Sequence, residues 1–494
     1  MMYTLKQANT YIEENRERVI ADYRNDYHAM APIGWINDPN GFIYYKGEYH
    51  LFYQYYPYKA VWGPMHWGHS KSKDLVNWET VPVALAPDQS YDKDGCFSGT
   101  AIEKDGKLYL MYTGHIEGET EEDIRQVQCI AVSSDGINFE KVEQNPVITE
   151  ADLPENAKPQ DFRDPKVVKK GDFYYSLIAS KKEDGGGQIL LYKSKDLLDW
   201  EFVSVMLNGE IDEGPMWECP DIFELDGKDV LLFSVEGLPK KENNFLNTHS
   251  VLAIVGEMDW EKGIFHKETV EELDYGLDFY APQTIEDDKN RRIMISWMQM
   301  WGRNIPTETE QHGWAGSMTL PRELFTQNNH VYQRPVAEIK NYYTNKQSYK
   351  TIKLSDETKA FEELSAEVSA IELVLDVKAG KRFDLEVRSN QVEKTLVSYD
   401  CETSFLELNR IDSGIELVGN EEEHVYKRSV YCEPENNKIE LEIFLDRASI
   451  EVFANHGKYT LTSTIYPTQK ADHIKIIAEG EIEVDRLDKW DIEV

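Results

Sequence analysis

The chain has 494 residues and carries 53 Lys and Arg against 90 Asp and Glu, a formal net charge of −37 at pH 7. Its length predicts two or more domains, because a single hydrophobic core rarely grows to that size. The electric field of this net negative charge repels nucleic acid and anionic lipid, so we expect neither as a partner.

The cysteines and the hydropathy further restrict the class of protein. The cysteines are scattered, without metal-ligand spacing, so we expect neither a disulfide framework nor a zinc site: Cys96, Cys129, Cys219, Cys401 and Cys432. No segment has the roughly twenty apolar residues that span a bilayer. The first residues also lack the apolar stretch of a signal peptide. We therefore expect a cytoplasmic protein.

The first predicted element is an amphipathic helix over residues 5–23, where apolar residues recur near helical spacing among many charges. We assign residues 1–26 to a short helical segment that packs on the domain behind it. After this segment the pattern changes to short strands with alternating apolar and polar residues, so the rest of the chain is predicted to be all-β.

One unit recurs through the first part of the chain. A turn is followed by an aromatic-rich strand, and the turn residues lie 59, 65, 56 and 63 positions apart: Gly47, Gly106, Gly171, Gly227 and Asn290. A second aromatic marker follows the first four turns after 31, 33, 29 and 33 residues: Trp78, Phe139, Trp200 and Trp260. Two markers in step favour a five-bladed β-propeller, over residues 27–341, against a sandwich with chance similarity.

From about residue 350 the repeat stops, and segments such as KIELEIFLDRASIEVFA alternate at the strand period. These segments predict a C-terminal β-sandwich over residues 348–494. The polar stretch 342–349 is interpreted as the linker between the two domains. A homodimer formed through the acidic sandwich is left open.

Three acidic motifs occupy equivalent positions in the repeat. WINDPNG contains Asp38, FRDPKV contains Asp164 and WECPDIF contains Glu218, and each motif precedes a turn of the repeat. The first strands of propeller blades meet around a central channel, so these carboxyl groups are expected at one end of it. Glycoside hydrolysis needs two carboxyl groups, one to protonate the leaving oxygen and one to attack or stabilise the sugar carbon. The spacing therefore indicates a candidate glycosidase site.

These motifs, with FSGT at 97–100 and DFYAPQ at 278–283, resemble the motif set of glycoside hydrolase family 32. That family contains invertases, sucrose-6-phosphate hydrolases, levanases and inulinases. The resemblance extends to HWGHSKSKDLVNWETVPVALAPD, GWAGSMTLPREL and FLDRASIEVFANHGKYTLTSTIYP, so it spans nearly the whole chain. It implies a five-bladed propeller followed by a β-sandwich, in agreement with the repeat, and a retaining β-fructofuranosidase that acts on sucrose-type sugars.

The resemblance also implies roles for individual residues. Asp38 corresponds to the nucleophile and Asn37 to a fructosyl ligand, Asp164 to the transition-state stabiliser assisted by Arg163, and Glu218 to the acid/base. Further residues match or are likened to the substrate-binding set: Gln54, Trp62, Phe97, Ser98, Tyr280 and Trp297. For this division of roles we expect burial and the charge of Asp38 to raise the pKa of Glu218, while Asp38 stays ionised.

Two histidines and one cysteine near these motifs could indicate a different chemistry. His66 and His69 lie three residues apart but lack a third ligand, so we expect no metal and no cofactor. Cys219 beside Glu218 has no accompanying His motif and is interpreted as packing against the acid/base. A non-catalytic sugar-binding propeller would not need paired carboxylates. A propeller glycosidase for arabinosyl or xylosyl units would not carry WINDPNG and FSGT together.

The sequence leaves the identity of the leaving group open. Sucrose, short fructo-oligosaccharides and sucrose 6-phosphate are all compatible with the resemblance, and a fructosyltransferase would share the same site. The segment 297–316 is expected beside the leaving-group subsite, where Arg303 and His312 would meet a phosphate and Trp301 would stack on a neutral sugar.

Overall fold

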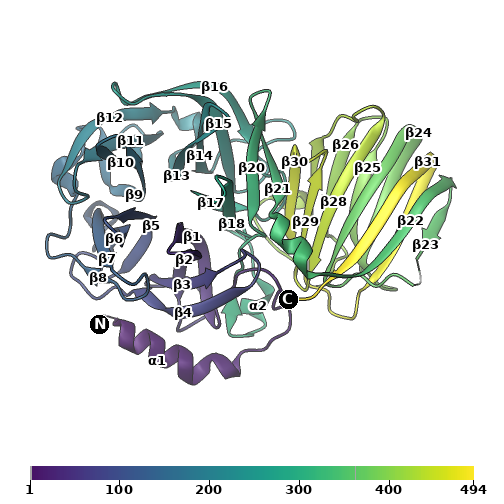
Figure 1. Ribbon diagram of the computed structural model, residues 1–494, viewed down its shortest axis with the longest axis horizontal. Coiled ribbons are helices and arrows are strands. Elements are labelled where there is room, and N and C mark those ends of the chain that lie inside the picture. Colours follow the sequence, from purple (N-terminus) through teal and green to yellow (C-terminus); the bar gives the residue numbers. More distant parts are fainter. Residues whose placement is uncertain (1–2, 362) are drawn as a thin grey trace.

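The structure, a computed structural model, describes residues 3–361 and 363–494. It consists mostly of strands in two modules that lie side by side (Figure 1). The first module is a five-bladed β-propeller and the second a nearly closed β-sandwich, which confirms the predicted fold class. Among these residues, no helix is both long and apolar enough to cross a membrane.

Each propeller blade is a small antiparallel sheet whose first strand lies nearest the centre of the ring (Figure 1). Blades one and two contain β1 (Gly34–Tyr45), β2 (Glu48–Tyr56), β3 (His66–Ser72), β4 (Trp78–Leu85), β5 (Gly95–Lys104), β6 (Lys107–Ile116), β7 (Arg125–Ser133) and β8 (Glu140–Lys141). Blade three contains β9 (Ala157–Lys170), β10 (Phe173–Lys182), β11 (Gly187–Ser194) and β12 (Trp200–Asn208). Blade four contains β13 (Met216–Leu225), β14 (Lys228–Glu236), β15 (His249–Asp259) and β16 (Ile264–Glu272).

The fifth blade closes the ring. It contains β17 (Tyr280–Glu286), β18 (Arg292–Trp297), β20 (Arg322–Gln327) and β21 (His330–Pro335). Between β18 and β20 the chain forms the short helix α2 (Pro306–Thr309) and then β19 (Trp314–Ala315). Strand β19 pairs in parallel with β1 and so joins the last blade to the first.

The two sequence markers have a common structural cause. All five turn residues adopt positive φ, between 57° and 86°, a conformation that Gly and Asn tolerate. The second marker follows an Asp whose side chain closes a turn. Asp74, Asp135 and Asp196 each accept two backbone N–H groups, from the second and third residues after them. The repeat is therefore visible in sequence because each blade reuses the same turns.

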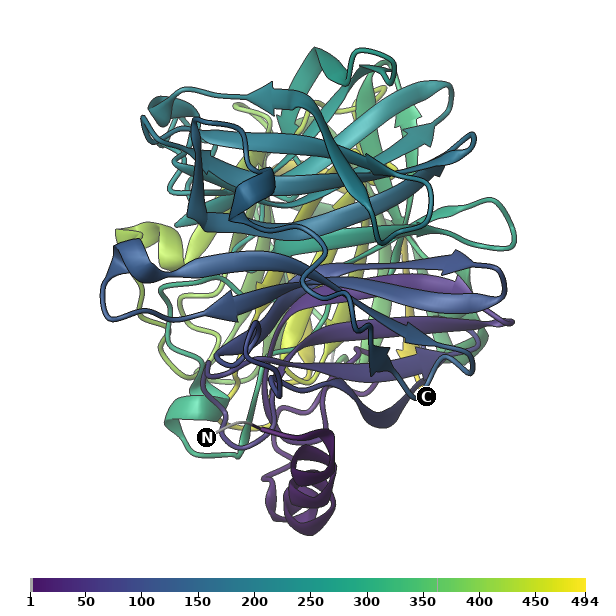
Figure 2. The same cartoon turned by 90° about the vertical axis from the view of Figure 1, so that its left-hand side faces the viewer.

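Helix α1 (Leu5–Asn15) is shorter than the predicted helix over residues 5–23. One 3₁₀ turn, η1 (Arg16–Arg18), follows, and then the chain becomes extended. The backbone of Ile20 pairs with the segment around His312 and accepts the indole N–H of Trp314, so a helix cannot continue through it. Figures 1 and 2 show α1 below the blades, where its Asn9 accepts the backbone N–H of Val83.

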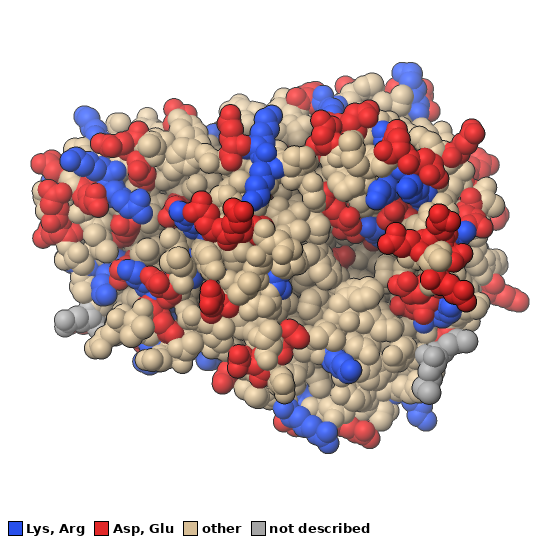
Figure 3. Space-filling model, turned by 180° about the vertical axis from the view of Figure 1, so that it is seen from behind, with Lys and Arg blue, Asp and Glu red and all other residues tan. Residues whose placement is uncertain are grey.

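The sandwich is one folded sheet. It contains β22 (Tyr343–Ser355), β23 (Thr358–Ala360), β24 (Ser369–Ser389), β25 (Thr395–Asp400), β26 (Phe405–Asn409), β27 (Lys427–Tyr431), β28 (Lys438–Asp446), β29 (Ser449–Ala454), β30 (Tyr459–Thr464) and β31 (His473–Ile492). The interpretation of residues 342–349 as a linker is wrong, because β22 starts at Tyr343 and pairs with β31. On the face shown in Figure 3, acidic and basic side chains are intermixed over the whole surface.

The chain before β1 ties the propeller to the sandwich. His28 is buried and its two ring nitrogens lie 2.7 Å from Asp446 and 2.9 Å from Glu451, both in the sandwich. Burial acts to lower the His28 pKa, but the two carboxylates outweigh it and raise the pKa to about 9. His28 is therefore a buried cation that bridges two strands of the second module.

We expect His28→Gln to cost most stability near pH 6 and much less near pH 10. Because the folded-state pKa is raised, the contribution of His28 is fully present below its unfolded value of 6.5 and is lost as the pH rises through about 9. A shift of this size corresponds to a contribution on the order of 3 kcal/mol. Urea unfolding of both proteins across this pH range measures it, and a difference that widened toward alkaline pH would contradict the assignment.

Candidate active site

The inner strands of all five blades are bulged at the same end of the channel. Each bulge adds residues on the inner strand opposite its neighbour, and a bulge re-aims the side chain it carries. The irregular segments run from Ile36 to Pro39, Phe97 to Gly99, Arg163 to Lys166, Glu218 to Asp221 and Tyr280 to Gln283. They carry one polar side chain per blade that hydrogen-bonds to the irregular segment of a neighbouring blade: Asp38, Ser98, Asp164, Glu218 and Tyr280.

Asp38 is held by donors on both carboxylate oxygens. The Ser98 hydroxyl donates to Oδ2 at 2.7 Å, and the Asn37 amide donates to Oδ1 at 3.1 Å. The indole N–H of Trp35 donates to the Asn37 oxygen at 2.9 Å and so fixes the amide with its nitrogen toward Asp38. Three residues of WINDPNG and one of FSGT thus form a single hydrogen-bonded unit.

Asp164 is positioned by its backbone and by its neighbour strand. Its backbone N–H donates to the Thr113 hydroxyl at 3.0 Å, and its Oδ2 accepts the Cys219 backbone N–H at 3.1 Å. Both Asp164 and Cys219 have positive φ, 61° and 50°, a strained conformation for residues with a Cβ. The thiol of Cys219 lies between the first two carboxylates, 3.7 Å from Asp38 and 3.6 Å from Asp164.

Glu218 is held by a cation and a phenol. Arg163 Nε donates to Oε1 at 2.9 Å, and the Tyr280 hydroxyl donates to Oε2 at 2.6 Å. The other nitrogens of Arg163 contact Asp161 at 2.9 Å and Glu236 at 3.0 Å. One guanidinium therefore serves three carboxylates, and its charge is shared among them.

The order of the carboxyl pKa values differs from the prediction. Burial raises the pKa of Asp38 to about 6 and that of Asp164 to about 8, with Glu218 adding to both increases. Burial also acts to raise the pKa of Glu218, but the charge of Arg163 and the Tyr280 hydrogen bond outweigh it and lower the pKa. The expectation that the Glu218 pKa is raised is therefore wrong, because this carboxyl group has the strongest donors.

The carboxyl groups line a cavity of about 490 Å³. Six of the predicted binding residues line it with the three acids: Asn37, Gln54, Trp62, Phe97, Ser98 and Arg163. Trp62 is 45% exposed, and Phe97 stacks on His115 with ring centroids 4.2 Å apart. Exposed aromatic rings beside carboxylates suit a ligand with apolar faces and hydroxyl groups.

Two predicted binding residues lie behind the cavity wall. Tyr280 is buried and reaches the cavity through its hydrogen bond to Glu218. Trp297 is fully buried and packs against Trp35 and Trp301, with ring centroids 5.9 and 4.9 Å away. Trp297 therefore supports the aromatic wall, and Trp301 is the residue of this group that lines the cavity.

The sequence reasoning did not find seven further lining residues: His115, Ile124, Gln126, Gln160, Asp161, Glu236 and His249. Two of them had a usable signal. The second strand of each blade runs from the turn back to the site, and Gln54, which lines the cavity, lies seven residues after Gly47. His115 and Glu236 each lie nine residues after their own turn, two positions beyond the Gln54 offset, so the repeat places them at the same end of their second strands.

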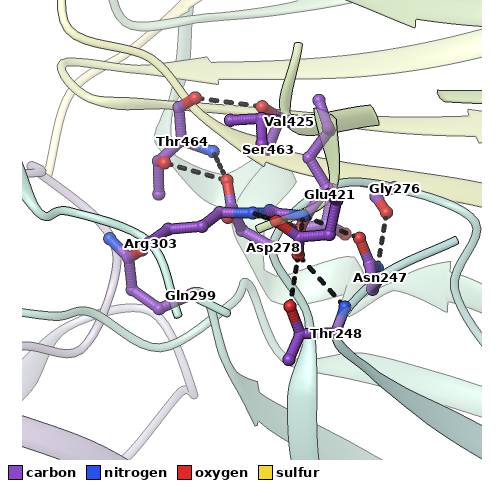
Figure 4. Close-up of polar contacts among 12 residues, drawn as sticks. Asn247, Thr248, Gly276, Asp278, Gln299, Arg303, Glu421, Val425, Ser463 and Thr464 are labelled. Atoms are coloured by element: carbon purple, nitrogen blue, oxygen red, sulfur yellow. Dashed lines mark hydrogen bonds and ion pairs between the residues drawn. The ribbon is translucent and has the colours of Figure 1, made fainter. Parts of the chain in front are cut away.

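The proposed phosphate contacts in segment 297–316 are wrong. The Arg303 side chain is 1% exposed and forms ion pairs with Asp278 and Glu421 at 2.9 Å, at the junction of the two modules (Figure 4). His312 is buried and stacks on Tyr23 with ring centroids 5.8 Å apart. Neither residue lines the cavity, whereas Trp301 does.

The surroundings of His66, His69 and the Cys219 thiol are those of packed structural residues. His69 stacks on Phe52, and His66 contacts the Pro64 carbonyl at 2.9 Å. Across the described residues, no group of three or more His, Cys, Asp or Glu side chains is arranged to hold a metal ion. Burial, with the charges of Asp164 and Asp38, raises the pKa of the Cys219 thiol well above its ordinary value, so the thiol stays protonated.

The inner strands of the propeller bring several carboxyl groups to one cavity, and hydrogen-bond donors there separate their pKa values. Glycoside hydrolases use carboxyl groups in this arrangement. The model of the glycosyl hydrolases family 32 N-terminal domain matches residues 28–335, and that of the family 32 C-terminal domain matches residues 338–491. The chain therefore belongs to glycoside hydrolase family 32.

Known proteins similar to this chain agree with that membership. A sucrose-6-phosphate hydrolase from Zymomonas mobilis is 39% identical, over 99% of this chain and 96% of its own. A raffinose invertase from Escherichia coli is 38% identical, over 97% of each chain. The structure of a Bombyx mori family 32 β-fructofuranosidase mutant in complex with sucrose superposes with a TM-score of 0.85, at 34% identity over 99% of this chain and 98% of that one.

Proposed function

We propose that the protein hydrolyses terminal β-D-fructofuranosyl residues of sucrose and short fructo-oligosaccharides with retention of configuration. The observation that carries the proposal is the meeting of Asp38, Asp164 and Glu218 at one cavity, each on the inner strand of a different blade. Free thiols at all five cysteines support a reducing, cytoplasmic location for this activity.

Two carboxyl groups carry the two steps of this reaction. Asp38 attacks the anomeric carbon while protonated Glu218 gives its proton to the departing oxygen, which leaves a fructosyl ester on Asp38. Glu218 then takes a proton from water, and the water oxygen displaces Asp38 from the same carbon. Asp164 accepts hydrogen bonds from fructosyl hydroxyls, which strengthen as positive charge develops on the ring.

The order of these pKa values favours Asp164 as the protonated carboxyl group, whereas catalysis needs the proton on Glu218. With pKa values of about 6 for Asp38 and about 8 for Asp164, the site near neutral pH has ionised Asp38 and protonated Asp164. Sugar hydroxyls that donate to Asp164 stabilise its ionised form, and this favours transfer of the shared proton to Glu218. Substrate binding therefore prepares the acid.

The charge of the cavity supports a neutral leaving group over a phosphorylated one. Among the described residues, the cavity lining contains five carboxyl groups and one guanidinium, that of Arg163, which already contacts three acids. Burial lowers the pKa of both lining histidines, His115 and His249, so neither supplies a reliable cation. A phosphate dianion would meet net repulsion there. The names of several relatives favour sucrose-6-phosphate hydrolysis as the second candidate.

The experiment is a comparison of sucrose, sucrose 6-phosphate and 1-kestose as substrates, with product analysis. We expect sucrose and 1-kestose to have the higher kcat/KM, equal release of fructose and its leaving group, and β-fructofuranose as the first anomer seen by NMR. A clear preference for the phosphorylated sugar would establish the second candidate. Release of glucose without equal fructose would establish a fructosyltransferase, and no cleavage of any of the three would refute the proposal.

We expect Tyr280→Phe to move the alkaline limb of the pH–rate profile to higher pH. The Tyr280 hydroxyl stabilises the ionised form of Glu218, so its removal raises the Glu218 pKa and keeps the acid protonated over a wider range. Tyr192→Phe is the matched control, because that hydroxyl donates to the Asp152 carbonyl outside the cavity. A limb displaced toward lower pH in Tyr280→Phe would contradict this role.

A further inference from the structure

A buried carboxylate of the sandwich reaches into the propeller beside the cavity. Glu421 lies just before the short 3₁₀ helix η6 (Glu422–Val425), and its side chain is 3% exposed. Its Oε1 and Oε2 accept hydrogen bonds from Arg303 at 2.9 and 3.3 Å. Figure 4 shows Arg303 extended across the junction toward this carboxylate. Arg303 lies two residues after Trp301, which lines the cavity.

The same carboxylate holds a second segment of the propeller. Glu421 Oε1 accepts the Thr248 backbone N–H at 3.1 Å and the Thr248 hydroxyl at 2.8 Å (Figure 4). The next residue, His249, begins β15 and lines the cavity. One side chain of the C-terminal module therefore fixes two propeller segments, and each segment presents a cavity residue within two positions of the contact.

A neighbouring contact reinforces the first segment. The Asn304 backbone N–H donates to the Val418 carbonyl at 3.1 Å, and the Val418 backbone N–H donates to the Asn304 side chain at 2.6 Å. Gly302, between Trp301 and Arg303, has a φ of 80° and so provides the sharp turn that sends one side chain to the cavity and the other to the sandwich.

The charges around Glu421 make the contact sensitive to its removal. Arg303 shares this region with two more buried arginines, Arg410 and Arg428. Burial and the charge of Arg303 lower the pKa of Arg428 to about 9, while Glu421 opposes that change. Without the Glu421 charge, the repulsion among the three guanidinium groups is less compensated and displaces Arg303 with its loop.

We infer that Glu421 is a positioning residue through which the C-terminal sandwich holds Trp301 and His249 at the sugar-binding cavity. The kinetic part of the test rests on the proposed function, since it needs a cleaved substrate. The inference goes beyond that function, because it assigns the second module a part in the geometry of the site.

The decisive variant is Glu421→Gln, which keeps the shape of the side chain and removes its charge. We expect KM for sucrose to rise roughly threefold to tenfold, as a displaced aromatic wall would cause, with a smaller change in kcat. In a Trp301→Ala background the same substitution should change KM much less, because its main route to the substrate is already gone. Glu451→Gln is the matched control: Glu451 is also a buried sandwich carboxylate that contacts the propeller, through Arg322 and the Leu320 N–H.

Hydrogen exchange gives a reading that does not depend on activity. Residues 245–249 and 299–305 should exchange faster in Glu421→Gln and stay unchanged in Glu451→Gln. If Glu421→Gln folds poorly, Asn304→Ala removes the side-chain bonds of Asn304 to the backbone of Val418 and Glu416, and it should speed exchange in 299–305 with a smaller rise in KM. Unchanged exchange in both segments, or the same KM increase with and without Trp301, would overturn the inference. An enzyme that cleaves no fructoside would refute the proposed function and leave the exchange test intact.

Discussion

Asp38→Asn should lose activity on every fructoside, by roughly 10⁴- to 10⁶-fold, because no leaving group can replace the missing attack on the anomeric carbon. Glu218→Gln should depend on the leaving group instead. A general acid typically contributes about 10²- to 10⁴-fold, and that contribution matters for sucrose but little for a p-nitrophenyl fructoside, whose phenoxide leaves without a proton. The ratio of the two substrates therefore separates the two roles.

The measurement is the first-turnover burst. Steady-state rates mix fructosylation with hydrolysis of the ester, in which Glu218 also acts, whereas the burst reports the first step alone. Glu218→Gln also leaves Arg163 with two carboxylate partners, Asp161 and Glu236, so the cation stays compensated and the fold should persist. If both variants lose the same factor on both substrates, the assigned roles are wrong or the two residues act as one unit.

Asp164→Asn should lower kcat by roughly 10²- to 10³-fold with little change in KM. An amide oxygen can still accept the Cys219 backbone N–H, now made by Asp164 Oδ2 at 3.1 Å, so the strand geometry should survive. What the amide cannot supply is negative charge where the flattened fructosyl ring becomes positive, and that charge acts on the transition state more than on the bound sugar.

Initial rates over a range of sucrose concentrations, with circular dichroism as the check on folding, measure this effect. Asp161→Asn is a useful comparison, because Asp161 also lines the cavity and contacts Arg163, but has no assigned contact with fructosyl hydroxyls. A rise in KM alone in Asp164→Asn would show that Asp164 contributes equally to ground-state and transition-state binding, against the role proposed here.

The propeller was predictable because its blades reuse local devices. The turns at Gly47 and Gly106 need positive φ, and the Asp74 turn needs a side-chain acceptor, so each leaves a residue type in the sequence at a fixed offset. The end of α1 was not predictable in this way. It depends on pairing of Ile20 with a segment almost 300 residues later, which periodicity within the helix does not report.

In the candidate site, too, features set by local motifs were predictable and features set by contacts between distant residues were not. Asp38, Asp164 and Glu218 could be chosen from sequence because each sits in a distinctive motif at one position of the repeat. The order of their pKa values could not, since it depends on which carboxyl Arg163 and Tyr280 contact across blades. Arg303 was misassigned for a related reason: its partner Glu421 belongs to a different module and lies 118 residues away.

The contacts of the first residues with the sandwich constrain how the protein can be made. The backbone of Asp26 and the ring of His28 bond to Asp446, 420 and 418 residues further along the chain. At typical synthesis rates of about 5–20 residues per second, that partner leaves the ribosome roughly 20 to 80 seconds after the segment that needs it. The blades can form in order during this interval. The segment before β1 that contains Asp26 and His28 cannot pair until Asp446 is available, so the polar groups of His28 stay in water. Ribosome-bound chains stopped before residue 446 should therefore contain formed blades and an N-terminal segment that proteases cut readily.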